Sequence, residues 1–232
     1  HSVRGVLGQS VSRGRWLEGR EALHLLQRSG SGEWSPETFV QELLQPISIA
    51  SVVEILDRQE TPVILEFISL ARELGEPAVD WLNLVLAESQ EKGHRRQIAD
   101  AITDLCRTNP ERLAPWISDP RWFVVRNVVH ILGAIGGPSI VSLLRSASRH
   151  PDARVRQDVV TALSGVELKH ARSLLVKMLE GADARIFSAV LHQLSAERGP
   201  SAAPILLALL QDPDFEQVVT TEEVTAPQVI SH

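Results

Sequence analysis

An internal repeat of about 31 residues is the feature that most constrains the fold of this chain. The segment WFVVRNVVHILG (122–133) aligns with ARVRQDVVTALS (153–164) and then with ARIFSAVLHQLS (184–195), at an offset of 31 residues each time. Three aligned columns are aliphatic: Val128, Val159 and Val190; Leu132, Leu163 and Leu194; Val129, Val160 and Leu191. Aliphatic residues at this spacing form one face of a helix. The repeat therefore predicts equivalent helices that bury equivalent faces.

Polar side chains occupy the remaining face of these predicted helices. A fourth column holds His130, Thr161 and His192, and Arg126 and Asn127 also lie off the aliphatic stripe. Each helix is preceded by Asp-x-Arg, at Asp119–Arg121, Asp152–Arg154 and Asp183–Arg185. An Asp before an apolar periodic run is typical of a helix N-cap, because its carboxylate accepts hydrogen bonds from free backbone amides.

Shorter helices and turn signals surround the three aligned helices. We expect helices over 138–149, 167–179 and 200–211, with Gly136-Gly137-Pro138 and Gly199-Pro200 at junctions. The repeat continues more loosely upstream, where IADAITDLC (98–106) aligns with VRNVVHILG (125–133) at an offset of 27. The helix candidates in this part of the chain are 16–28, 36–45, 47–58, 61–74, 77–88, 92–107 and 110–117. The repeating unit is a helix, a tight turn and a capped helix, which predicts an all-α chain.

This unit resembles HEAT repeats, specifically the short bacterial kind. The resemblance is carried by LLALLQDPD (206–214) and HPDARVRQDVVTAL (150–163), with Val155-Arg156 at the family's usual Val-Arg position. It is clear over 110–211, with two departures: Ile186-Phe187 replaces the pair in the next unit, and Val125-Arg126 is one residue out of column.

The resemblance implies a right-handed alpha-alpha superhelix, a solenoid of about six to seven stacked helical hairpins with one continuous core. It also implies that the helix with the Val-Arg position lines the concave side, so that the polar column would face a shared groove, while Arg156 is structural. We expect an N-terminal cap or the end of a preceding segment over 1–46, the solenoid over 47–211, and an incomplete repeat, tail or linker over 212–232.

Charge is distributed unevenly along the chain. The net charge is −6, yet residues 92–156, called here the basic segment, carry 11 basic and 5 acidic residues, a net charge of +6. Such asymmetry can steer an acidic partner or can be solvated surface. The single cysteine, Cys106, fits a reducing compartment, so we expect a cytoplasmic chain. No apolar run reaches about 18 residues, so no membrane span is expected.

The sequence offers little catalytic or metal-binding chemistry. His130 and His192 lie two repeats apart, roughly 20 Å if stacked helices are about 10 Å apart, too far to share a metal. The chain has no His-Glu dipeptide of the kind that iron-binding HEAT hydroxylases carry. Cys106 lies in an apolar helix, and GAIGGPS (133–139) lacks the Lys of a phosphate loop. We expect no catalytic residue, no metal and no cofactor.

The favoured hypothesis is a non-catalytic scaffold that binds a protein or peptide, acidic in part, in the concave groove, as a module of a larger bacterial protein. The expected contact residues are Arg95, Arg96, Arg126, Asn127, His130, Asp158, Thr161, Ser188 and His192. The alternative is a HEAT-like DNA-binding protein or DNA glycosylase that uses the basic segment. Its candidate residues are Trp116, Trp122, Arg95, Arg96, Arg121, Arg126 and Asp119, although the chain as a whole is acidic, with a pI of about 5.8.

Overall fold

The structure is a computed structural model that describes the whole chain except residues 1–2, 30–34, 45, 59–60, 181 and 196–232. The chain divides into two compact units, His1–Ile135 and Gly136–His232, and each is described here by itself. The helix expected over 200–211 and the segment 212–232 lie outside the described residues. The three segments expected from the sequence, 1–46, 47–211 and 212–232, stay predictions.

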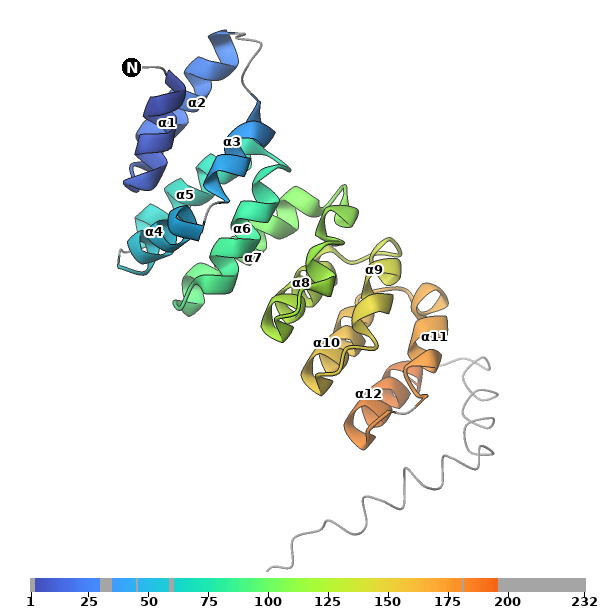
Figure 1. Cartoon of the computed structure of the whole chain (residues 1–232). Coiled ribbons are helices and arrows are strands. Elements are labelled where there is room, and N and C mark those ends of the chain that lie inside the picture. Colours follow the sequence, from blue (N-terminus) through green and yellow to red (C-terminus); the bar gives the residue numbers. More distant parts are fainter. Residues whose placement is uncertain (1–2, 30–34, 45, 59–60, 181, 196–232) are drawn as a thin grey trace, which may run out of the picture. The chain divides into compact units, whose positions relative to one another are not determined.

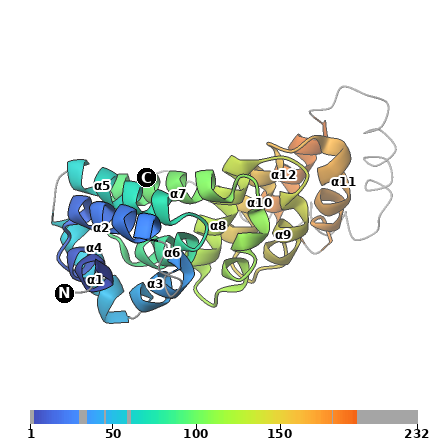
Figure 2. The ribbon, with the colours of Figure 1, turned by 90° about the horizontal axis from the view of Figure 1, so that it is seen from above.

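The first unit is built from helices in two layers (Figures 1 and 2). Its elements are α1 (Val3–Ser12), α2 (Trp16–Ser29), α3 (Pro36–Leu43), α4 (Pro46–Asp57), α5 (Thr61–Leu74), α6 (Ala78–Glu88), α7 (Lys92–Cys106), the 3-10 turns η1 (Pro110–Leu113) and η2 (Trp116–Ser118), and α8 (Trp122–Ile135). In one layer α2 packs on α5, α5 on α7 and α7 on α8. In the other, α1 packs on α4, and both α3 and α4 pack on α6.

The second unit repeats this arrangement with α9 (Ile140–Ala147), α10 (Ala153–Leu163), α11 (Leu168–Lys177) and α12 (Ala184–Ser195). Here α9 packs on α11, and α10 on α12. The described residues contain no strand. The expected all-α solenoid of stacked helical hairpins is therefore confirmed.

Helix ends follow the predicted signals. The Asp152 carboxylate accepts a hydrogen bond from the Arg154 backbone N–H at 2.8 Å, which caps α10. Gly75 has φ 74° and Gly136 has φ 70°. This left-handed conformation is strained for other residues, and the two glycines follow the ends of α5 and α8.

Two segments differ from the sequence expectation. The helix expected over 110–117 is instead the pair of short 3-10 turns η1 and η2. Pro115 is the reason, because proline lacks a backbone N–H and its ring clashes with the preceding helical turn. The helix α1 was not expected, and it forms with Leu7 and Val11 buried.

The aliphatic columns of the repeat form the core. Val128, Val159 and Val190 are each 0% exposed, and Leu132, Leu163 and Leu194 are at most 2% exposed. The polar column behaves oppositely, because His130, Thr161 and His192 are all exposed. In the third aliphatic column Val129 and Val160 are buried, whereas Leu191 is half-buried. The 31-residue alignment thus separates buried from exposed positions except at Leu191.

No single helix in the described part of the chain is long and apolar enough to cross a membrane, and only the bent pair of α3 and α4 passes that test together.

Replacing Leu163 with Ala tests the role of the aliphatic columns. Leu163 is fully buried, so Leu163→Ala leaves a cavity and is expected to lower the free energy of unfolding by about 2–5 kcal/mol. Thr161→Ala, on the exposed face of the same helix, is the matched control and is expected to change it by less than about 0.5 kcal/mol. Urea unfolding followed by circular dichroism measures both, and equal effects would contradict the assignment of the two faces.

Candidate functional site: a groove between α10 and α12

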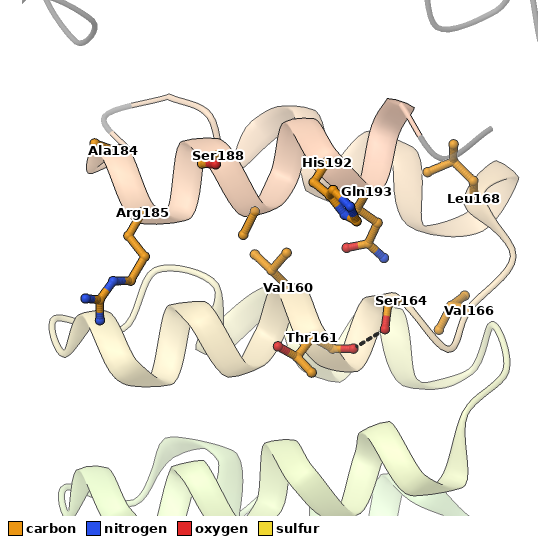
Figure 3. Close-up of a pocket in the computed structure, with 11 residues that line it drawn as sticks. Val160, Thr161, Ser164, Val166, Leu168, Ala184, Arg185, Ser188, His192 and Gln193 are labelled. Atoms are coloured by element: carbon orange, nitrogen blue, oxygen red, sulfur yellow. Dashed lines mark hydrogen bonds between the residues drawn. The ribbon is translucent and has the colours of Figure 1, made fainter. Parts of the chain in front are cut away.

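An open groove of about 990 Å³ lies between α10 and α12 in the second unit (Figure 3). The start of α11 and the turn before it close one end, through Val166 and Leu168. The remaining lining residues come from α10 and α12: Val160, Thr161, Ser164, Ala184, Arg185, Ser188, Ala189, His192 and Gln193. The groove therefore belongs to two equivalent helices of the repeat and to the turn that joins their hairpins.

The repeat itself explains the mixed polarity of this surface. Thr161 and His192 occupy one alignment column, and Val160 precedes Thr161 on the edge of the buried stripe. The small side chains of Ala184, Ser188 and Ala189 leave room between the helices. Two hydroxyls already donate to backbone carbonyls, Thr161 Oγ1 to Gln157 O at 3.2 Å and Ser164 Oγ to Thr161 O at 2.7 Å. Both oxygens can still accept a hydrogen bond.

The structure brings three of the expected contact residues together. Thr161, Ser188 and His192 are exposed and line this groove. Asp158, also expected, is half-buried on α10 and is not among the lining residues. Sequence reasoning missed Arg185, Ser164 and Gln193, which line the groove as well.

The other five expected residues belong to the first unit. Arg95 and Arg96 are exposed on α7, Arg126 and Asn127 are half-buried on α8, and His130 is exposed on α8. The helices α7 and α8 pack on one another, so these residues share two neighbouring helices. Their role as partner contacts stays a prediction.

Much of the charge of the basic segment is engaged in ion pairs. Five of its 11 basic residues pair with carboxylates: Arg107 with Asp104, Arg112 with Asp80, Arg121 with Glu88 and Asp119, Arg154 with Asp152, and Arg156 with Asp183. A nucleic-acid phosphate would have to compete with these carboxylates for the same guanidinium groups. The excess charge counted along the sequence therefore overstates the positive charge available to a polyanion.

Three of the residues that suggested a DNA glycosylase, Asp119, Arg121 and Trp116, have structural partners. Asp119 accepts hydrogen bonds from the Arg121 backbone N–H at 2.8 Å and from its guanidinium Nε at 3.0 Å. The Arg121 guanidinium holds the pKa of the Asp119 carboxyl below its usual value. Trp116 donates its indole N–H to Asp80 at 2.8 Å. Asp119 and Trp116 thus stabilise the chain before α8, and the nucleic-acid alternative gains nothing from their positions.

Cys106 is fully buried at the end of α7. Burial raises the pKa of its thiol to about 12, which disfavours the nucleophilic thiolate. Among the described residues no group of three or more His, Cys, Asp or Glu side chains could hold a metal ion.

A comparison with known families identifies repeats of this kind. The family described as HEAT repeats matches residues 79–164 and 141–224, which together span more than half of the chain. No match is found among curated proteins. The first range runs from α6 to the end of α10, and the second contains the whole groove.

The Asp119–Arg121 pair predicts a dependence of stability on acid pH. Because the folded-state pKa of Asp119 is lowered, its carboxylate stabilises the fold above the pKa of an unfolded aspartate, about 3.9, and this contribution is lost as the pH falls through the lower folded-state value. The free energy of unfolding of the wild type should be about 1 kcal/mol higher than that of Asp119→Asn at pH 7, and this difference should disappear in acid. Urea unfolding from pH 7 to pH 2 measures it.

The control for this experiment is Asp100→Asn, because Asp100 is exposed on α7 and forms no ion pair within the described residues. Its difference from wild type should stay small at every pH. A difference for Asp119→Asn that persists unchanged in acid would show that the carboxylate charge does not contribute.

The buried thiol predicts slow chemical modification. In the native chain at pH 8, Cys106 should react with a maleimide many-fold more slowly than in urea, because its thiol is both buried and protonated. Mass spectrometry of timed samples measures the rate. Rapid labelling of the native chain would contradict a purely structural role for Cys106.

Proposed function

The chain belongs to the HEAT-repeat family, and from this premise we propose that it is a non-catalytic scaffold that binds a protein or peptide in the groove between α10 and α12. HEAT repeats are typically protein-interaction scaffolds and are generally not catalytic. We further propose that the chain acts in the cytoplasm as a module of a larger bacterial protein.

The observation that carries this proposal is the convergence of Thr161, Ser188 and His192 on one groove. Thr161 and His192 were expected from the exposed column of the repeat, and Ser188 was a further expected contact on the same helix as His192, independently of any cavity. The groove is large enough for several side chains, at about 990 Å³, and it combines an apolar floor with hydroxyl, imidazole and amide groups at its edges. A surface of this kind suits an extended segment of another protein, whose side chains need apolar contact and whose backbone needs hydrogen-bond partners.

A peptide-display selection against the whole chain tests the proposal. Peptides enriched on wild type should bind Ser188→Tyr at least tenfold more weakly, because the ring would fill the space between α10 and α12 and remove contacts that are worth several-fold each in affinity. Fluorescence anisotropy with the selected peptides measures the dissociation constants.

The matched control is Ser173→Tyr, because Ser173 is exposed on α11 and does not line the groove. This variant should bind the peptides as wild type does. Equal binding by the Ser188→Tyr chain, with its circular dichroism unchanged, would place the interaction elsewhere and overturn the proposal.

A further inference from the structure

The three Asp-x-Arg sequences that precede the repeat helices do not behave alike. In the first two, the arginine folds back onto its own aspartate. The Arg121 guanidinium contacts both Asp119 carboxylate oxygens at 3.0 Å, and the Arg154 guanidinium contacts those of Asp152 at 3.1 and 2.7 Å. The Arg154 guanidinium holds the Asp152 pKa at about 2. In both cases the positive charge is used within the motif.

The third motif is different because its aspartate is taken by another arginine. Asp183 accepts one hydrogen bond from the Ile186 backbone N–H at 3.0 Å and another from Arg156 Nη2 at 3.1 Å. The Arg156 guanidinium is held in place by hydrogen bonds to the His150 and Pro151 carbonyls, both at 2.9 Å. The Asp183 carboxylate is thus occupied by Arg156 rather than by Arg185.

Arg185 consequently lines the groove. Its side chain is exposed and projects from the start of α12 toward α10 (Figure 3), and no carboxylate pairs with it among the described residues. Among the described residues that line the groove, it is the only one with a permanent charge, and none of them is Asp or Glu. Within the described part of the chain, the groove therefore has one permanent positive charge at one end and no lining carboxylate that neutralises it.

We propose that the groove selects a short extended peptide with an Asp or Glu side chain placed against Arg185. This inference rests on the proposed function and names the chemistry of the partner. A guanidinium and a carboxylate form two parallel hydrogen bonds, which fixes both the charge and the orientation of the peptide. An acidic partner was expected from the basic segment, but the residue that would select it here is Arg185, which lies outside that segment.

The rest of the groove defines the remainder of the peptide. From Ala184 to Gln193 the helix rises about 14 Å, which matches about four residues of extended chain. Beyond Arg185, Val160 and Ala189 offer an apolar surface for an aliphatic side chain. At the far end lie His192 and Gln193, and Gln193 Oε1 has no hydrogen-bond partner within the described residues. The Gln193 Oε1 atom is buried, so the exposed His192 imidazole is the group at this end that a peptide can reach.

The test uses fluorescein-labelled hexapeptides from the display selection, with acetylated and amidated ends so that the only carboxylates are side chains. Each acidic peptide is paired with its Asn or Gln counterpart. Against the whole chain, Arg185→Gln should weaken binding of the acidic peptide about tenfold, the effect of losing a hydrogen-bonded charge partner. The neutral counterpart should bind wild type and Arg185→Gln equally.

Arg154→Gln is the matched control, because Arg154 holds the same motif position but lies against its own Asp152, outside the groove lining. It should bind the acidic peptide as wild type does. Arg185→Glu adds a gain of function that misfolding cannot imitate, since it should prefer a peptide with Lys in place of the acidic residue.

The outcomes separate this inference from the proposed function. Peptides that bind wild type and fail on Ser188→Tyr, but bind Arg185→Gln unchanged, would overturn the role of Arg185 and leave the scaffold proposal standing. Equal losses in Arg154→Gln and Arg185→Gln would indicate unspecific charge attraction and would also overturn it. If no peptide bound wild type, both proposals would fail.

Discussion

The fold depends on burial of aliphatic side chains between neighbouring hairpins. A hairpin of this size cannot cover its own apolar faces, so its helices are stable only when the next hairpin stacks on them. In the second unit α10 packs on α12, and Val159, Leu163 and Val190 have no exposed surface or almost none. This stacking uses one face of each helix, and positions at the edge of that face stay exposed. The groove arises there because successive helices present equivalent positions, such as Thr161 and His192, side by side.

Polar contacts between hairpins then decide which charges remain for a partner. In the first unit Arg72 pairs with Asp104, Arg112 with Asp80 and Arg121 with Glu88, across separations of 32 or 33 residues. Arg112 and Asp80 are half-buried, whereas the other two pairs are more exposed, and exposed pairs contribute little stability individually, roughly 0–1 kcal/mol. Their effect on recognition is larger, because a guanidinium held by a carboxylate attracts an external anion weakly. Net charge counted along a segment is therefore a poor guide to what this surface can bind.

The sequence was sufficient to predict most of the fold because one alignment contained two separate signals. The buried columns determined which residues form the core, and the exposed column, with His130, Thr161 and His192, determined the face that carries the groove. The failures have local causes. Pro115 prevents a regular helix over 110–117, and α1 contains Gly5 and Gly8, which disfavour a helix intrinsically. That helix forms because Leu7 and Val11 are buried when it packs on α2, an effect of tertiary contact.

The position of Arg185 in the groove could not be predicted from its own motif, because the Asp-x-Arg sequence is the same in all three repeats. Arg185 differs from the other two arginines because of a residue in the preceding repeat. Arg156 stands at the Val-Arg position and takes the Asp183 carboxylate. In the motif before α10, by contrast, the Asp152 carboxylate is bound by its own Arg154. The carboxylate that Arg185 would otherwise bind is thus taken by Arg156, which stands in the preceding repeat helix. If Arg185 selects the partner as we propose, Arg156 contributes to that selection although it does not itself line the groove.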